Sequence, residues 1–210
     1  MASTKQRGFS LLELTIAVSV SLILAAVADV TLQPVLQQQR VNDAYNTTIA
    51  AMRRARDQAA ADMRVYTVTF SAANPGINGG TITVTQDIPG APILFTATLP
   101  YDVTYHIEPG IPTSQTIAPT TPDGFGTGAT AFDFDQPPSG LGGGTTIYFY
   151  PDGSAQDNGP NGGNINNGVV YMGVPGQLAT CRAVSLYGYT GRIRGWRLVY
   201  ASGQWKWSQP

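Results

Sequence analysis

The chain begins with a long apolar segment. From Phe9 to Ala28 the only charged residue is Glu13, and the basic octapeptide MASTKQRG precedes the segment. About twenty residues in a helix, at 1.5 Å each, span roughly 30 Å, the thickness of the hydrocarbon core of a bilayer. A carboxylate inside such a span is costly and usually has a partner. The pattern therefore predicts a membrane-spanning helix in which Glu13 has a specific role.

The helical pattern continues beyond this segment but becomes amphipathic. Over residues 35–64, apolar side chains recur at steps of three and four residues, which places them on one face of a helix. These side chains are Val41, Tyr45, Ile49, Met52, Ala59 and Met63. Pro34 lacks a backbone donor and predicts a kink where the helix leaves the bilayer. We expect one helix over residues 9–64, transmembrane over 9–28 and exported and amphipathic over 29–64.

After residue 64 the pattern changes to short strands. Runs rich in β-branched and aromatic residues alternate with clusters of Gly and Pro, which mark turns and loops. The expected strands are Val65–Phe70, Thr81–Thr85, Ile93–Leu99, Val103–Ile107, Ala129–Phe134, Thr145–Tyr150, Val169–Val174, Ala183–Tyr187 and Arg197–Tyr200. A long helix whose apolar stripe covers an antiparallel sheet gives an α+β fold. We therefore expect the helix to pack on an antiparallel β-sheet domain that occupies residues 65–210.

The N-terminal motif resembles that of a known family. Lys5-Gln6-Arg7-Gly8, followed by Phe9-Ser10-Leu11-Leu12-Glu13-Leu14, is similar to the class III leader of type IV pilins and type II secretion pseudopilins. The resemblance implies that residues 1–8 are a leader peptide, that a prepilin peptidase cleaves after Gly8, and that Phe9 is then methylated. It also implies that Glu13 meets the N-terminal amine of a neighbouring subunit in a filament, where a cation makes a buried carboxylate tolerable.

The flanking charges predict the topology. Lys5 and Arg7 place the N-terminus in the cytoplasm by the positive-inside rule, so residues after Val30 lie outside the inner membrane. The alternative is a conventionally secreted β-domain whose signal peptide is cleaved after Ala26-Val27-Ala28. That alternative leaves Glu13 without a purpose, and it does not explain why the helical pattern continues past residue 29.

A second resemblance lies near the C-terminus. The sequences TTIYFYPDGSA and CRAVSLYGYTGRIR are similar to the H-type minor pseudopilins and FimT-like minor pilins, the GspH/FimT family. Its motifs fall on Pro151-Asp152-Gly153 and on Gly191-Arg192-Ile193-Arg194. The chain departs from many pilins because Cys181 is its only cysteine, which excludes an intramolecular disulfide and favours a buried apolar role for that side chain. It also adds an apparent hairpin after Gly195.

The charges of the exported domain fall into two opposed halves. Residues 65–157 hold eight acids and no Lys or Arg, whereas residues 158–210 hold five bases and no acid. Three interpretations stay open: the halves pair internally, the bases form a groove for an anionic partner such as DNA, or they dock an acidic neighbouring pilin. Aromatic side chains interleave with the bases and would stack on nucleobases. The bases of such a groove are Arg192, Arg194, Arg197 and Lys206.

The residues that carry chemistry do not form a catalytic set. His106 is the only histidine and Cys181 the only cysteine, which leaves no Ser/His/Asp triad, no cysteine-protease pair and no zinc site of the usual composition to propose. Acid pairs at Asp133 and Asp135, and at Asp152 and Asp157, allow a calcium site, but we favour solvated loop acids. We expect no metal, no cofactor and no enzymatic activity.

The sequence thus predicts a filament subunit. The first hypothesis is a minor pseudopilin or minor pilin, anchored in the bacterial inner membrane and extracted into a type II secretion pseudopilus or a type IV pilus tip. The second is a FimT-like minor pilin that binds DNA for uptake, and the third is the conventionally secreted domain. The expected partners are the prepilin peptidase, other pilins, the inner membrane, and secreted cargo or DNA.

Overall fold

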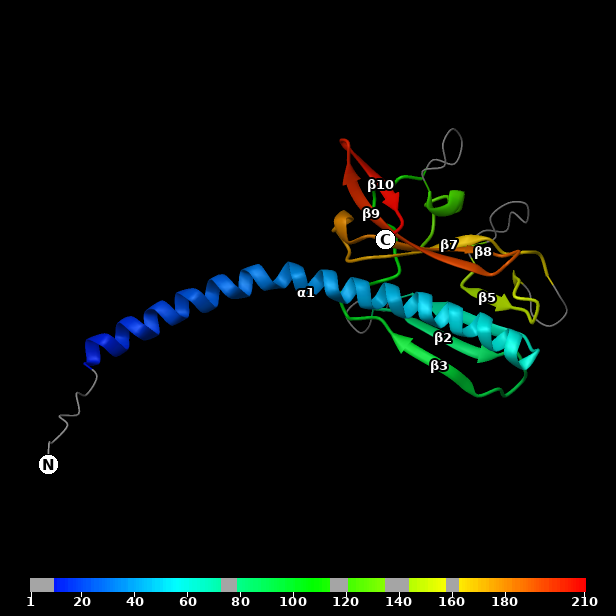
Figure 1. Cartoon of the computed structure of the whole chain (residues 1–210), viewed down its shortest axis with the longest axis horizontal. Coiled ribbons are helices and arrows are strands. Elements are labelled where there is room, and N and C mark those ends of the chain that lie inside the picture. Colours follow the sequence, from blue (N-terminus) through cyan, green and yellow to red (C-terminus); the bar gives the residue numbers. More distant parts are fainter. Residues whose placement is uncertain (1–9, 73–78, 114–120, 135–143, 158–162) are drawn as a thin grey trace, which may run out of the picture. The chain divides into compact units, whose positions relative to one another are not determined.

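The computed structural model (Figure 1) describes residues 10–72, 79–113, 121–134, 144–157 and 163–210. Gly8, Phe9, the expected turn at Asn74-Pro75-Gly76, and Asp135 lie outside the described residues. The chain divides into two compact units, residues 1–38 and residues 39–210.

A single helix, α1 (Leu11–Asp62), supplies the first unit and enters the second. It runs through Pro34, and the kink expected there stays a prediction. The helix ends in a Schellman-type cap, because Met63 adopts a left-handed φ of 53° and the Arg64 amide donates to the Ala59 carbonyl at 3.2 Å. This cap stops the helix two residues before the expected end at Arg64.

Two five-stranded antiparallel sheets follow, where the sequence pattern predicted one sheet. The first has the order β3-β2-β1-β5-β6, and its strands are β1 Tyr66–Ser71, β2 Thr81–Gln86, β3 Ile93–Thr98, β5 Thr146–Phe149 and β6 Ala155–Gln156. The second has the order β10-β9-β8-β7-β4, with β4 Phe132–Asp133, β7 Gly168–Met172, β8 Arg182–Tyr187, β9 Arg192–Ala201 and β10 Gln204–Ser208. The helix followed by antiparallel sheets confirms the α+β pilin-like architecture.

Some expected strands differ from the observed ones. Val103–Ile107 is not a strand, and its one ladder contact is an isolated bridge between Thr104 and Gly173. Short 3-10 turns, η1 (Pro122–Gly124) and η2 (Leu178–Thr180), stand where the pattern gave no element. β9 is longer than expected because it starts at Arg192 and forms a hairpin with β10, which accounts for the C-terminal hairpin expected from the sequence.

One core joins the second half of α1 to both sheets. Val41, Met52 and Ala55 of α1 are fully buried, in one cluster with Val68 of β1 and Val184 of β8. Figure 1 shows β2 and β3 on one side of this half of the helix and β7 to β9 on the other. The pattern follows from the amphipathic stripe, since burying an apolar face is the main source of stability for such a helix.

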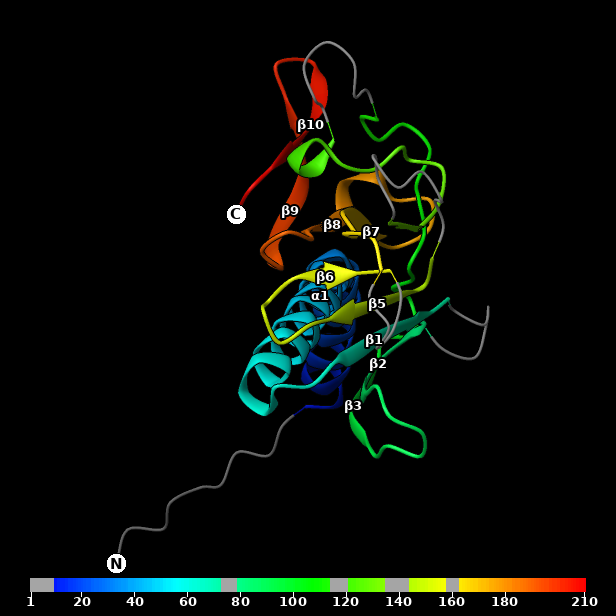
Figure 2. The ribbon, with the colours of Figure 1, turned by 90° about the vertical axis from the view of Figure 1, so that its right-hand side faces the viewer.

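A smaller apolar cluster covers the opposite face of the second sheet. It contains Val169 and Tyr171 of β7 with Leu198 of β9, and three half-buried tryptophans pack against it. Every residue of β7 is buried, because this central strand has packed side chains on both faces. Figure 2 shows the β9–β10 hairpin beside the turn η1, which lies next to this second cluster.

Candidate functional site

Glu13 lies in the first turn of α1 and makes a local hydrogen bond. Its Oε2 accepts the backbone N–H of Ser10 at 3.0 Å, and the Ser10 carbonyl accepts the Leu14 amide at 3.1 Å. A Ser followed three residues later by a Glu is the spacing of a capping box, in which the acid satisfies the donor at the N-cap. Within one subunit, then, Glu13 caps its own helix.

The polar side chains of the apolar half of α1 are also satisfied locally. Thr15 donates to the carbonyl of Leu12 at 2.9 Å, Ser19 to that of Thr15 at 2.7 Å, and Ser21 to that of Ala17 at 2.8 Å. Hydroxyls that bond to the preceding turn can enter hydrocarbon without leaving a donor unpaired. α1 is long and apolar enough to cross a membrane.

Two of the four expected anion-binding bases meet one carboxylate. Asp123 of η1 accepts from Arg194 at 2.9 Å, and Arg192 lies 3.6 Å from the same oxygen. Ser185 donates to the other oxygen of Asp123 at 2.5 Å. The Asp123 side chain is only 7% exposed, whereas those of Arg192 and Arg194 are 45% and 41% exposed. The acidic and basic halves therefore pair here, and both guanidinium groups also face solvent.

Asp123 is held in a strained conformation. Its φ of 54° lies in the left-handed region, which side chains other than glycine seldom adopt. The contacts with Ser185, Arg194 and Arg192 supply interactions that hold it there. The indole N–H of Trp196 donates to the Ser185 hydroxyl at 2.9 Å and extends the network across β8 and β9.

The other two bases lie elsewhere. Side chains alternate along β9, and Gly195 faces α1 so closely that an added Cβ would overlap the hydroxyl of Tyr45. Arg197 shares that face and lines a cavity of about 340 Å³ with Tyr45. Lys206 is exposed on β10, opposite Val199. The four bases expected to form one stripe are thus divided between the two faces of the second sheet.

The three tryptophans gather at one groove, next to the Asp123 network. Trp196, Trp205 and Trp207 line an open groove of about 750 Å³ between η1 and the β9–β10 hairpin, and Asp123 lines it as well. The sequence pattern names these rings but does not assemble them. The available signal is the two-residue spacing of Trp205 and Trp207, which places both side chains on one face of a strand.

The two C-terminal family motifs form a turn-to-turn contact. Gly191 has a φ of 57°, and a Cβ there would overlap the carbonyl of Gly153, so the turn at Gly191 requires glycine. Arg56 of α1 donates to the carbonyl of Gly191 at 3.2 Å. At the other motif, Asp152 accepts the amide of Ser154 at 2.8 Å. Both motifs therefore serve packing between the helix and the two sheets.

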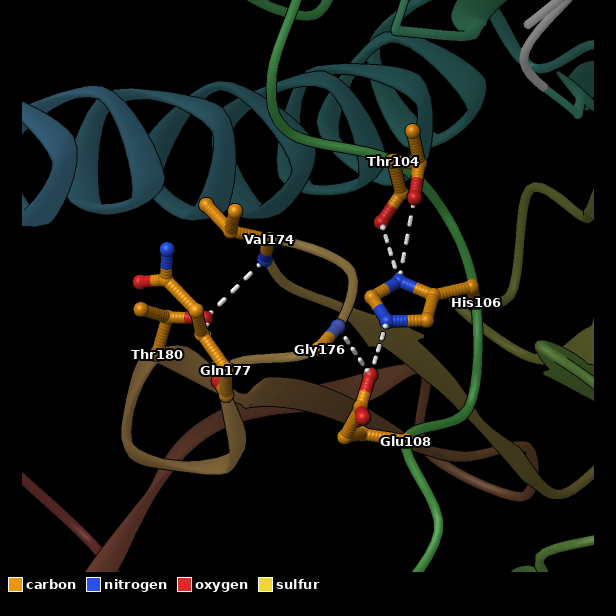
Figure 3. A network of polar contacts seen from close by, with 7 residues as sticks. All are labelled: Thr104, His106, Glu108, Val174, Gly176, Gln177 and Thr180. Carbon is orange, nitrogen blue, oxygen red and sulfur yellow. Dashed lines mark hydrogen bonds and ion pairs between the residues drawn. The ribbon is translucent and has the colours of Figure 1, made fainter.

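His106 and Glu108 form a polar network with the turn after β7 (Figure 3). Nε2 of His106 donates to Glu108 at 2.9 Å, Nδ1 lies 3.0 Å from the Thr104 hydroxyl, and the Gly176 amide donates to the same Glu108 oxygen at 2.9 Å. The His106 ring, followed by the Gly176 amide, holds the pKa of the Glu108 carboxyl below its usual value. The network fastens the stretch before Gly110 to the turn at Gly176.

Cys181 is buried behind this turn, in agreement with the sequence-based interpretation. Burial raises the pKa of its thiol to about 12, so the group stays protonated at neutral pH and is a poor nucleophile.

The candidate calcium ligands bond to their own loops. Asp133 accepts from the hydroxyl of Thr127 at 2.8 Å and the amide of Gly128 at 3.0 Å, and Asp157 accepts the amide of Asn164 at 2.8 Å. Within the described residues, no group of three or more metal-ligating side chains comes together.

Comparison with known proteins identifies the N-terminal segment. A family model described as the prokaryotic N-terminal methylation motif matches residues 3–28, which include Gly8, Phe9 and Glu13. No match to the chain was found among curated proteins or among solved structures. The match ends with the apolar segment and does not extend into the β domain. The chain therefore carries, over residues 3–28, the N-terminal methylation motif that is typical of type IV pilin-like proteins.

Proposed function

We propose that the protein is a structural minor pseudopilin or minor pilin that joins a type II secretion pseudopilus or a type IV pilus tip and supports protein secretion. The observation that carries the proposal is the continuity of α1. The same helix bears the methylation motif at one end and is locked into the β domain at the other. A pull on the anchor is thus transmitted to the domain. This role is mechanical and needs no catalytic group.

The proposed assembly begins with cleavage after Gly8 and methylation of Phe9. The cytoplasmic leader is removed, the single span holds the subunit in the inner membrane, and the β domain lies in the periplasm. On extraction, the exposed apolar half of α1 exchanges lipid for the helices of neighbouring subunits. Glu13 then exchanges its contact with the Ser10 amide for a neighbour's N-terminal amine, because an unpaired carboxylate is destabilising in an apolar bundle.

Placement in the GspH/FimT group is part of the proposal. It is supported by the contact between the turns at Gly153 and Gly191, which gives the two C-terminal motifs a shared structural purpose. In a tip-located subunit of this kind, the second sheet and its hairpin are available to contact other minor pseudopilins or exported cargo.

DNA binding is the second candidate function. The exposed guanidinium groups of Arg192 and Arg194 beside three tryptophans favour it. The pairing of both bases with Asp123 and the position of Arg197 on the other face weaken it. With two phosphates neutralised, the log-log salt slope for a single strand is roughly −1.4. A measured slope near that value, flattened by Arg192→Ala with Arg194→Ala, would favour uptake over secretion.

The experiment for the first proposal is a matched pair of substitutions in α1. Glu13→Ala removes a charge, so membrane insertion should be intact while incorporation into the filament falls severely. Thr15→Val, one half-turn away, loses only a hydroxyl that bonds within the helix and should assemble normally. Quantitative immunoblotting of sheared filaments and of membranes separates the two steps. Normal incorporation of Glu13→Ala would overturn the assembly role of this carboxylate.

A further inference from the structure

The tryptophan groove has a built polar lining as well as aromatic walls. Thr121 is 4% exposed and lines the groove, and its hydroxyl has no hydrogen-bond partner among the described residues. A buried hydroxyl without a partner is costly, so such groups in native proteins call for an explanation. Asp123 adds a nearly buried carboxylate in the same wall. A hydroxyl group of a bound ligand would give the Thr121 hydroxyl the hydrogen-bond partner that it lacks.

The volume and depth of the groove fit a small, extended ligand. Its volume of about 750 Å³ lies within the range of roughly 300 to 1,000 Å³ that is usual for small-molecule sites. The three indole rings are half-buried, so their free surface faces the groove or solvent while the remainder packs on Leu198 and Tyr171. Such rings offer flat, rigid contact area at a low cost in conformational entropy.

The hydrogen-bonding state of the indoles selects the ligand class. The N–H of Trp196 is taken by Ser185 at 2.9 Å, and that of Trp207 by the Pro112 carbonyl at 3.3 Å. Two of the three indoles therefore have no free N–H donor for a ligand and can contact it only through their ring surfaces. A proline-rich peptide needs donors for its carbonyls, which are scarce here. A pyranose ring presents polarised C–H groups to the electron-rich face of an indole, and its hydroxyls both donate and accept.

Charge makes a nucleic acid the competing ligand that has to be tested. The groove wall holds Asp123 with its exposed partners Arg192 and Arg194, while Lys206 lies between Trp205 and Trp207 on β10, so its side chain turns to the other face of that strand. A nucleic acid strand prefers a groove of net positive charge, whereas an uncharged ligand has no such requirement. The amide of Gln204 at the mouth supplies a further donor and acceptor.

We propose that the groove between η1 and the β9–β10 hairpin binds an uncharged oligosaccharide, with Trp196, Trp205 and Trp207 as its platform and Thr121 and Asp123 as its polar contacts. All of these residues lie in the unit of residues 39–210, so the site does not depend on filament assembly. Glu13→Ala should accordingly bind the sugar as the unmodified protein does.

Intrinsic fluorescence makes the test specific, because the chain has 3 tryptophans and all of them line the groove. The full chain, held in a detergent without sugar head groups, is titrated separately with cellotetraose, chitotetraose and maltotetraose. We expect a saturable change in emission with at least one of them. Proline decapeptide and an oligo-dT strand serve as competing probes.

Three variants decide whether the signal comes from this site. Trp205→Ala removes the one indole of the three whose N–H makes no hydrogen bond within the described residues, and it should weaken binding about tenfold, the loss expected when one stacked ring is removed. Thr121→Val keeps the shape of a side chain that has no partner to lose, so it should fold normally and weaken binding about threefold. Tyr101→Ala, an exposed aromatic that contacts Arg40 outside the groove, should bind normally.

Three outcomes would overturn the proposal: no saturable response to any tetrasaccharide, a response only to proline decapeptide or oligo-dT, or full binding by a correctly folded Thr121→Val and Trp205→Ala.

Discussion

The two halves of α1 share one helix but differ in what covers them. In residues 11–38 the large apolar side chains lie bare in the isolated chain, with exposures from 48% at Leu36 to 80% at Leu11. In residues 39–62, Val41 and Met52 are fully buried against the sheets. An apolar face of the first kind needs a partner outside the chain, either lipid or a neighbouring subunit. α1 therefore joins an apolar segment that needs a partner outside the chain to a segment that is already packed in the β domain.

Truncating one large side chain in each half of α1 should show most clearly that the two halves contribute differently to the free energy of unfolding. Met52→Ala opens a cavity in the core and should lower the free energy of unfolding of the β domain by about 2 to 5 kcal/mol. Leu24→Ala removes a side chain that is 64% exposed in the isolated chain and should leave that unfolding transition in place. Chemical denaturation of both proteins in detergent gives the comparison. Equal losses would mean that the two halves are not energetically distinct.

A substitution where α1 approaches β9 closely should have a smaller effect on stability, and a second substitution should reverse part of it. Gly195→Ala forces a methyl group against the hydroxyl of Tyr45 and should cost about 1 to 3 kcal/mol of stability by overpacking. Adding Tyr45→Phe removes the hydroxyl but leaves the ring carbon Cζ, and Ile49 Cδ1 at 2.8 Å, too close to the position of the new methyl group, so it should restore only part of the loss. The double-mutant cycle, measured by thermal unfolding, would reveal this coupling. If the effects of the two substitutions on stability simply add, the Gly195 and Tyr45 positions are not coupled, which contradicts the close contact between them.

Acid should weaken the domain that holds the second half of α1, through Glu108. Because the folded state lowers the pKa of this carboxyl below its ordinary value of 4.5, the folded protein binds fewer protons there than the unfolded chain. The contribution is complete above the ordinary pKa and is lost as pH falls through the folded pKa. Glu108→Gln should flatten this part of the stability curve and cost about 1 kcal/mol at neutral pH, through weaker hydrogen bonds to His106 and Gly176. If the stability of the variant falls at low pH as steeply as that of the wild-type protein, other carboxylates cause the acid sensitivity.

The helix and the α+β class were predictable because they rest on periodicity alone. The apolar run, the stripe through Val41 and Met52, and most strands are local patterns. The division into two sheets was not predictable, because it depends on long-range pairing such as β1 with β5. The expected strand at Val103–Ile107 was wrong as a strand. Its one ladder contact is the bridge between Thr104 and Gly173, and the His106 ring bonds to Thr104 and to Glu108, whose carboxylate accepts the Gly176 amide.

The site was predictable only in part. The leader motif is a contiguous signal, and the family comparison matches it directly. The charge asymmetry left pairing between the halves as one of three interpretations, and it did not indicate that one carboxylate, Asp123, would meet both Arg192 and Arg194. The tryptophan groove needed the fold, because η1 and β10 are far apart in sequence and enclose the groove between them only after the second sheet is built.

The apolar half of α1 is expected to be a prepilin anchor that the mature protein keeps, and not a signal peptide that is removed. Mass spectrometry of the N-terminal peptide of the mature protein tests this most directly. We predict that the peptide begins at Phe9 and carries one methyl group on its amine, and that a bulky residue at Gly8 blocks its formation. A mature protein that begins at Asp29, with residues 9–28 removed, would contradict the account.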